Sequence, residues 1–279
     1  MDEAFLHGLY GCGAVALLCW LLGVLTREHS WVDRLWSITP FAYVGFFAWR
    51  GGFADARVNL MFALSLAWGL RLTYNFARKG GYAKGGEDYR WLVLKAKLSP
   101  WQWQLFGFFF VAGYQNLLLY LIALPAWLAL RGAQPLGPID AVAVVGFSAA
   151  LVLETVADQQ QWRFQESKRA AREAKRPHAN FLTSGLFRYS RHPNFFAEQA
   201  LWWCFYLFSV AATGEWLNVT IVGPTLLTLL FHGSTNFTES ISLSKYPEYA
   251  DYQRRVSRLV PWPAETTGSE TAEAASGER

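Results

Sequence analysis

The stretch FLTSGLFRYSRHPNFFAE, residues 181–198, joins a basic run to a long apolar segment, and the rest of the chain can be organised around it. Ser184-Gly185 marks a turn, because glycine adopts backbone conformations that other residues avoid. Asn194 and Glu198 are four residues apart, so on a helix they share one face. A carboxylate where a helix enters a bilayer is costly unless a ligand or a partner satisfies it. The stretch therefore predicts the edge of a site at the end of a membrane helix.

The cations of this stretch have two interpretations. Arg188, Arg191 and His192 fall within five residues and are suited to the phosphates of a ligand. Alternatively, they hold anionic lipid headgroups at the membrane surface. The lipid interpretation explains neither Asn194 nor Glu198, so a ligand site is favoured.

Composition places the chain among membrane proteins. Of its 279 residues, 53% are hydrophobic and 16% are charged, whereas about 25% are charged in a soluble domain. The 14 Trp and 21 Phe residues suit the aromatic belts of a polytopic membrane protein. A net charge of +4 without a basic face argues against a nucleic-acid partner. Cysteines within apolar segments and scattered histidines predict no metal site.

Apolar stretches predict an all-α, polytopic membrane protein with seven transmembrane helices, its N-terminus outside and its C-terminus in the cytoplasm. Several stretches approach the ~20 residues that a spanning helix needs. In this orientation the inside segments carry 21 of the 25 Lys and Arg residues, the outside loops carry three, and Arg71 lies within the third span. This bias needs an odd number of spans. The stretches are residues 5–25, 35–50, 58–76, 104–130, 139–160, 195–213 and 216–236.

The chain is expected to form one domain over residues 1–262. Residues 263–279 are rich in Glu, Thr, Ser, Ala and Gly, and we expect them to be a disordered tail. The first apolar run is expected to be an uncleaved helix, since the first basic residue, Arg27, follows it. Residues 11–16 formally match a dinucleotide fingerprint, but no βαβ unit surrounds them. Close helix packing by small residues is the better interpretation.

The third apolar stretch ends in a polar stripe. Arg71, Asn75 and Arg78 fall at i, i+4 and i+7 and so share one helix face. A buried Arg within a span marks a ligand pathway or a salt bridge, and snorkelling to the surface is the alternative for Arg78. The next loop, KGGYAKGGEDYRW (residues 79–91), combines glycine N–H groups with cations. It is either a phosphate cradle or a flexible basic loop.

GLFRYSRHPNFFAE (residues 185–198) resembles the C-terminal motif of the steroid 5α-reductase superfamily, in its bacterial branch, a domain of unknown function named DUF1295. Wider relatives include sterol reductases and isoprenylcysteine carboxyl methyltransferases. The similarity extends over about residues 25 to 262. It also includes Glu87-Asp88-Tyr89-Arg90, and Glu239 followed by Tyr246 and Tyr249. The Arg-His-Pro element is shared with the methyltransferases, so by itself it does little to distinguish a reductase from a methyltransferase.

The resemblance implies an oxidoreductase of the 3-oxo-5α-steroid 4-dehydrogenase type. Such an enzyme is embedded in the membrane and uses NADPH to reduce the C=C bond of an α,β-unsaturated ketone. A hydrophobic steroid or lipid-like enone is the implied substrate, and the active site faces the cytoplasm. The membrane would be the inner membrane of a bacterium or the endoplasmic reticulum of a eukaryote.

Negative charge develops on the substrate carbonyl as hydride arrives, and a protonated acid or a Tyr hydroxyl stabilises it. The resembling reductases carry an acidic residue near Asp33, which is therefore the candidate catalytic acid, held protonated by apolar surroundings. An ordinary helix cap is its alternative role. Tyr74 is the candidate phenol. The implied cofactor-binding residues are Arg71, Asn75, Arg78, Tyr89, Arg90, Arg169, Arg188, Tyr189, Arg191, His192, Asn194, Glu198, Asn236, Glu239, Tyr246 and Tyr249.

Two other functions stay open. A membrane methyltransferase using S-adenosylmethionine would share the Arg-His-Pro element, although Asn194 stands where those enzymes usually have an aromatic residue. A non-catalytic lipid or sterol binder would have a cavity without cofactor affinity.

Overall fold

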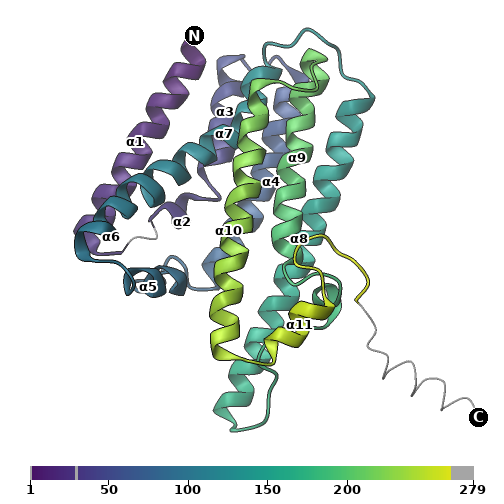
Figure 1. The fold of residues 1–279 in the computed structure, drawn as a ribbon. Coiled ribbons are helices and arrows are strands. Elements are labelled where there is room, and N and C mark those ends of the chain that lie inside the picture. The colour runs from purple at the N-terminus through teal and green to yellow at the C-terminus, as the bar shows by residue number, and fades with distance from the viewer. Residues whose placement is uncertain (1, 29–30, 265–279) are drawn as a thin grey trace, which may run out of the picture. The chain divides into compact units, whose positions relative to one another are not determined.

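The structure is a computed structural model that describes residues 2–28 and 31–264. Within these ranges it contains helices, turns and no β-strand, which confirms the all-α class. In chain order (Figure 1), the elements are α1 (Glu3–Thr26), α2 (Trp31–Leu35), α3 (Thr39–Arg50), α4 (Ala56–Arg78), α5 (Tyr89–Lys95), α6 (Pro100–Phe106), the π-helix η1 (Gly107–Tyr114), α7 (Gln115–Ala129), α8 (Pro138–Glu173), the 3-10 turn η2 (Gly185–Arg188), α9 (Pro193–Thr213), the 3-10 turn η3 (Val219–Ile221), α10 (Val222–Lys245) and α11 (Tyr249–Arg255).

Helix ends follow from local chemistry. The Asp2 side chain accepts a hydrogen bond from the N–H of Ala4 at 3.1 Å, and the Asp55 side chain accepts one from Val58 at 2.9 Å. These carboxylates cap α1 and α4, since the first N–H groups of a helix lack partners. Pro193 opens α9, where its missing N–H costs nothing.

Four of the described helical segments are long and apolar enough to cross a membrane. They are Glu3–Thr26, Pro100–Ala129, Pro138–Glu173 and Pro193–Thr213. Length and composition therefore do not support the predicted count of seven. The predicted span 35–50 contains only the 12-residue helix α3, about 18 Å long, against a hydrocarbon core of about 30 Å.

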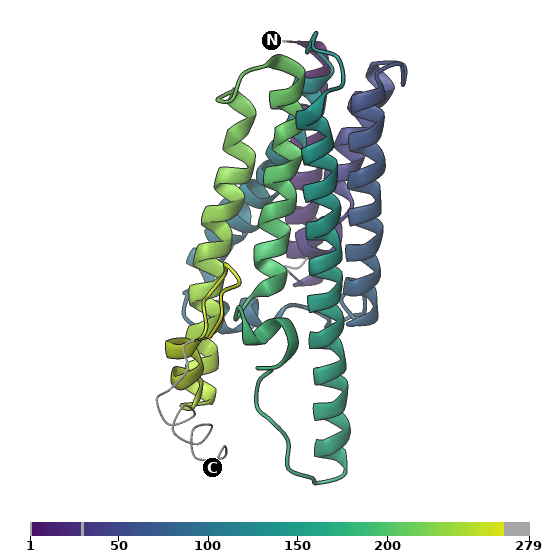
Figure 2. The same cartoon turned by 90° about the vertical axis from the view of Figure 1, so that its right-hand side faces the viewer.

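Helix α8 differs from the prediction in length. A span was expected over residues 139–160, ahead of the basic run. The two are one helix of 36 residues, about 54 Å long, and Figure 2 shows it running without interruption. No Gly or Pro lies between Glu154 and Glu173 to end the helix.

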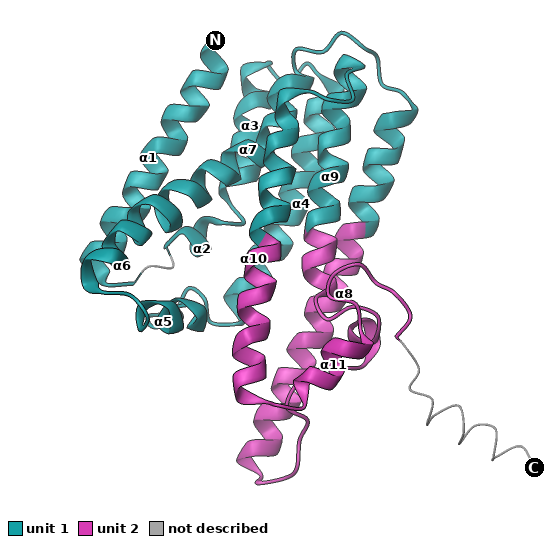
Figure 3. Ribbon diagram, viewed as in Figure 1, with its two compact units in different colours: residues 1–149, 199–230 teal, residues 150–198, 231–279 magenta. Residues whose placement is uncertain are grey.

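The chain divides into two compact units (Figure 3). Unit 1 comprises residues 1–149 and 199–230, and unit 2 comprises residues 150–198 and 231–279. The single domain predicted over residues 1–262 thus contains both units. Most of the predicted tail, residues 265–279, lies outside the described residues.

In unit 1, helices α1, α3, α4 and α7 pack around large side chains. Trp68 and Tyr120 are fully buried, and the Tyr120 hydroxyl donates to the carbonyl of Phe5 at 2.7 Å. A Cβ on Gly8 would lie 2.8 Å from the Tyr120 ring. Close packing was predicted for residues 11–16, and Gly8 lies outside them. At Gly11 and Gly13 a Cβ would meet no atom within 4 Å, so the predicted close contact does not occur at these two glycines.

A buried ion pair in unit 1 joins the start of α4 to the start of α8. Arg57 donates from Nε to Asp140 Oδ1 at 2.7 Å and from Nη2 to Oδ2 at 2.9 Å. Its Nη1 and Nη2 also donate to the carbonyl oxygens of Gln134 and Pro135, at 3.0 and 2.9 Å. Both charged side chains are buried, so the loop before α8 is fixed to the start of α4.

Arg57→Ala is expected to lower the thermal unfolding midpoint of the protein in detergent strongly. It leaves the Asp140 carboxylate buried without its cation, which costs about 3–5 kcal/mol. Arg50→Ala is the control, because Arg50 meets the exposed Glu3 at 3.5 Å and such pairs contribute about 0–1 kcal/mol. Tryptophan fluorescence during heating measures both. Equal midpoints for the two variants would contradict this role of the buried pair.

Candidate functional site

Unit 2 contains a backbone clasp between two segments far apart in sequence. The N–H of Arg191 donates to the carbonyl of Ser257 at 2.8 Å, and that of His192 donates to Arg258 at 3.2 Å. The N–H of Trp262 donates to the carbonyl of Tyr189 at 2.9 Å. The chain from 189 to 192 is thereby fixed just before α9 begins at Pro193.

The turn that leads into the clasp requires a glycine. Gly185 has a φ of +64°, in the left-handed region, and a Cβ there would lie 2.5 Å from Gln160 Oε1. The same Gln160 oxygen accepts the N–H of Leu186 at 2.9 Å. The turn predicted at Ser184-Gly185 is therefore present, and it is held against α8.

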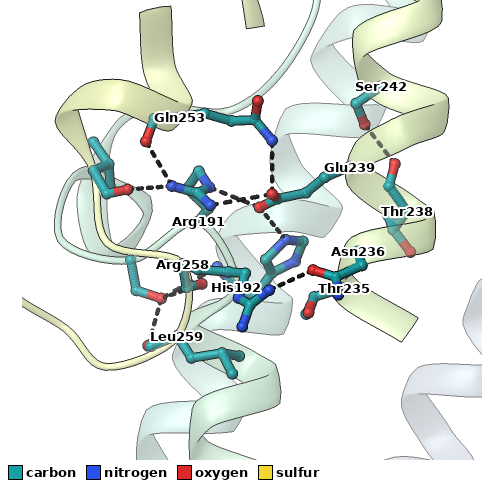
Figure 4. Close-up of polar contacts among 12 residues, drawn as sticks. Arg191, His192, Thr235, Asn236, Thr238, Glu239, Ser242, Gln253, Arg258 and Leu259 are labelled. Carbon is teal, nitrogen blue, oxygen red and sulfur yellow. Dashed lines mark hydrogen bonds and ion pairs between the residues drawn. The ribbon is translucent and has the colours of Figure 1, made fainter. Parts of the chain in front are cut away.

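Glu239 on α10 is the acceptor at the centre of this region (Figure 4). Arg191 donates to it from Nε at 2.7 Å and from Nη2 at 3.1 Å. The His192 Nε2 lies 2.9 Å from Oε1, and Gln253 Nε2 donates to Oε2 at 2.7 Å. Glu239 is 5% exposed. One carboxylate thus joins α10, the clasp and α11.

The surroundings of Glu239 determine its ionisation. Burial by itself would raise its pKa, but the hydrogen bonds from His192, Arg191 and Gln253 outweigh burial and lower the pKa to about 2. The carboxylate is therefore ionised at neutral pH. Arg191 is likewise held by the carbonyl oxygens of Gln253, at 2.8 Å, and of Val256. This network therefore stabilises the position of residues 191 and 192, immediately before α9.

Three buried carboxylates and an amide lie on α8 and α9 in unit 2. Glu154, Asp158 and Glu198 are each about 4–5% exposed. Asn194 Nδ2 lies 3.5 Å from Asp158 Oδ1, so the Asn194 amide from the predicted stretch faces α8. Buried carboxylates are stabilised by hydrogen-bond donors or cations, so α8 and α9 concentrate acceptor groups in this part of unit 2.

The cations of unit 2 differ in their surroundings. Arg188 is exposed, with its guanidinium 5.9 Å from the Tyr189 ring, and Arg169 pairs with Glu166 on the surface at 2.9 Å. Lys168 is buried and donates to the carbonyl of Asn180. Arg188 and Tyr189 are therefore accessible at the surface of unit 2.

The remaining predicted residues of unit 2 lie on α10, on α11 and in the turn between them. Asn236 is exposed and accepts from Arg258. The Tyr246 hydroxyl lies 3.5 Å from Lys168 Nζ. Tyr249 is buried against Phe181, with ring centroids 5.0 Å apart. Tyr249 therefore packs in an aromatic cluster, and its role in cofactor binding stays a prediction.

In unit 1, the candidate acid Asp33 lies in the first turn of α2. Its Oδ2 accepts a hydrogen bond from Trp91 Nε1 at 2.8 Å. The candidate phenol Tyr74 is 66% exposed, and its ring lies 5.6 Å from the Arg78 guanidinium. Asp33 is thus held in place by a second side chain, whereas Tyr74 lies at the surface of unit 1.

The predicted stripe on α4 is partly internal. Asn75 Oδ1 accepts from Arg78 Nε at 2.9 Å and from Nη2 at 2.7 Å. Asn75 is buried, and Arg71 is partly buried one turn earlier. These contacts confirm that Asn75 and Arg78 share a face, as their spacing predicts.

The glycine-rich loop is occupied by carboxylates of the chain itself. Gly85 N–H donates to Glu28 at 2.9 Å, and Glu28 also pairs with Arg34 at 2.6 Å. Arg90 pairs with Asp88 at 2.6 Å, while Tyr89 is 47% exposed. One backbone N–H of the loop therefore donates to a carboxylate of the chain itself, and the phosphate cradle stays a prediction.

Sequence reasoning missed two residues that hold these regions together. Gln253 completes the Glu239 network, and Arg34 donates to the carbonyl of Gly81 at 3.3 Å in addition to Glu28. Arg34 is 7% exposed. The position of Arg34 next to Asp33 in a short helix was a signal that could have identified it. A buried Arg needs several acceptors, so an Arg of this kind is expected to hold several segments together.

The donor and acceptor set of unit 2 fits a nicotinamide nucleotide. Asn194 and the buried acids match the carboxamide and ribose hydroxyls in hydrogen-bonding type, and Arg188 matches a phosphate. Among the described residues, no group of three or more His, Cys, Asp or Glu could hold a metal ion.

Comparison with known proteins gives one family. Residues 19–256 match the family described as "Protein of unknown function (DUF1295)". An uncharacterized protein of Schizosaccharomyces pombe is 39% identical over 273 residues, which cover 92% of this chain and 79% of the relative. This relative is a yeast protein, so a specifically bacterial branch is not shown. No solved structure matches.

Glu239→Gln is expected to lower the free energy of unfolding at neutral pH, and this loss is expected to shrink as the pH falls. A carboxylate whose pKa falls from 4.5 to about 2 on folding stabilises fully above its unfolded pKa, and this contribution is lost as pH falls from about 5 to 2. The wild-type protein should therefore exceed the variant most at pH 6–7. Urea unfolding across this range measures the difference. A stability gap that does not shrink on acidification would contradict the assignment.

Proposed function

Because the chain belongs to the DUF1295 family, within the steroid 5α-reductase-like superfamily, we propose that it is an NADPH-dependent reductase embedded in a membrane. The proposed reaction reduces the C=C bond of an α,β-unsaturated ketone, with a 4-ene-3-oxo steroid as the leading substrate class. Membership supports a membrane enzyme of this superfamily. The identity of the cofactor, the identity of the substrate and the roles of the residues described below are parts of the proposal.

The observation that carries the proposal is the buried polar set of unit 2. Helices α8 and α9 both meet the requirements of a membrane span, yet they bury Glu154, Asp158 and Glu198 beside the half-buried Asn194 amide. Burying such groups is costly in a purely structural helix pair. The carboxamide and the ribose hydroxyls of a soluble nucleotide would add hydrogen-bond donors to this acidic set.

Each residue of unit 2 has a proposed role. Asn194 and Glu198 would bind the nicotinamide carboxamide or the ribose beside it. Arg188, which is exposed, would bind a phosphate, preferably through two N–H groups. The Arg191, His192 and Glu239 network would act on the cofactor through position, because it fixes the chain immediately before Asn194.

When bound, a reduced nicotinamide supplies the hydride that reaches the β-carbon of the enone. The chain's own contribution to that step is assigned to unit 1. Asp33, oriented by the Trp91 hydrogen bond of 2.8 Å, would hold a proton towards the carbonyl oxygen, where negative charge develops. The exposure of Tyr74 makes it the weaker candidate for the same role.

We also propose that the nucleotide enters from the cytoplasm. The segments assigned to that side carry 21 of the 25 Lys and Arg residues, and cytoplasmic loops of membrane proteins carry such an excess. This orientation corresponds to seven crossings with the N-terminus outside, of which four are supported by helix length and hydropathy. Cysteine labelling from each side of sealed vesicles would test it.

Asn194→Ala and Glu198→Gln are each expected to weaken NADPH binding about tenfold to a hundredfold, since each removes hydrogen bonds in a buried site. Quenching of tryptophan fluorescence by NADPH, with purified protein, measures this. Asn180→Ala is the control, because Asn180 bonds Glu248 near the surface. Binding by both site variants within about twofold of wild type would exclude this site. Absence of binding by wild type would favour a lipid binder.

Asp33→Asn is expected to lower the turnover of an enone roughly a hundredfold or more, while NADPH affinity stays unchanged. The amide keeps the shape of the acid but donates a weaker hydrogen bond to the developing oxyanion. Asp251→Asn is the matched control at an exposed site. NADPH oxidation at 340 nm, in parallel with S-adenosylmethionine consumption, is the assay. Near-normal turnover of Asp33→Asn would remove Asp33 from the mechanism.

A further inference from the structure

Unit 1 contains a cavity that has no part in the proposed reductase chemistry. It has a volume of about 400 Å³ and lies among the end of α1, the end of α5 and the start of α6. The residues that form it include Gly23, Val24, Arg27, Lys95, Trp103 and Gln104. Its size is within the range of small-molecule sites.

The cavity is cationic. Arg27 and Lys95 both line it, and none of the described residues that line it is acidic. The nearest acid in sequence, Glu28, is bound by Arg34 at 2.6 Å and by the Gly85 N–H at 2.9 Å. Neither lining cation forms an ion pair within the described part of the chain. Two cations at one cavity without a carboxylate favour an anionic ligand.

Lys95 is also held towards the cavity wall. Its Nζ lies 5.9 Å from the centre of the Trp103 ring, and Trp103 is 3% exposed. A cation over an indole face is attracted to it. The ammonium group is therefore positioned before any ligand binds, which lowers the entropic cost of binding.

The cavity lies at the ends of two helices that are suited to cross a membrane. One of them ends at Thr26, and the other begins at Pro100. Next to the cavity residues, large apolar side chains are exposed: Leu25 is 77% exposed, Trp101 64% and Leu105 49%. Trp and cationic side chains collect at the headgroup level of a bilayer, and exposed Leu side chains meet its hydrocarbon.

We propose that this cavity binds the phosphate group of one anionic phospholipid. Arg27 contacts the phosphate through its planar guanidinium, and Lys95 supplies a second positive charge. The acyl chains then lie along the exposed apolar residues of α1 and α6. A free phosphate ester has the same charged group but gains nothing from those apolar side chains, so the lipid is the ligand that both features fit.

The test uses the full-length protein, purified in non-ionic detergent and analysed by native mass spectrometry. The probes are dioctanoyl phosphatidylglycerol, dioctanoyl phosphatidylcholine and glycerol 3-phosphate. Phosphatidylglycerol is expected to bind as one molecule per chain, more tightly than phosphatidylcholine and far more tightly than glycerol 3-phosphate. The double variant R27A/K95A is expected to weaken this binding roughly 30-fold.

The matched control is K175A/R176A, which removes two exposed cations from unit 2 and changes the net charge equally. It should bind phosphatidylglycerol within about twofold of wild type, since distant surface charges are screened. Equal losses in the two double variants would overturn the site in favour of general electrostatic attraction. Equal binding of glycerol 3-phosphate and phosphatidylglycerol would overturn the lipid assignment.

Discussion

A single buried carboxylate, Glu239, is the constraint on which the described part of unit 2 depends. Removing a charge from water costs several kcal/mol unless partners compensate it, and Glu239 receives donors from Arg191, His192 and Gln253. These partners belong to three separate parts of the chain. Satisfying one charge therefore fixes the start of α9 relative to α10 and α11, and with it the position of Asn194.

The sequence predicted what depends on local spacing. Asn194 and Glu198 do lie on one helix, with the Asn194 amide near Asp158 on α8, and Asn75 and Arg78 do share a face of α4. The turn at Gly185 followed from the chemistry of glycine. Helical periodicity and turn propensity act over a few residues, so one sequence suffices to predict them.

What depends on pairing between distant segments could not be predicted in this way. Arg191 and His192 appeared as possible ligand-binding cations, whereas both face Glu239, 48 and 47 residues further along the chain. In the glycine-rich loop, the Gly85 N–H donates to Glu28, which lies 57 residues earlier in the chain. Hydropathy also predicted more spans than helix length and composition support, since α3 is apolar but short. Spacing identifies candidate charges, and only the fold decides which of them neutralise one another.

The charged side chains of the protein therefore fall into two sets with different roles. One set is internal: Arg57 with Asp140 in unit 1 and Arg191 with Glu239 in unit 2 hold segments together. The other set includes Arg188, Arg27 and Lys95, which are exposed and lack an ion-pair partner among the described residues. These are the cations proposed to bind the phosphates of a soluble nucleotide and of an anionic lipid.

The central claim is that hydride passes from a nicotinamide nucleotide to an enone on this protein. The most direct measurement is the mass of the product formed from a 4-ene-3-oxo steroid and NADPH deuterated at C4 of the nicotinamide, with separate reactions for the two deuterated faces. If the proposed reaction takes place, the product carries one deuterium at its β-carbon, and only one of the two deuterated faces delivers it. A product that gains no deuterium from either face, or a substrate that gains a methyl group from S-adenosylmethionine, would contradict it.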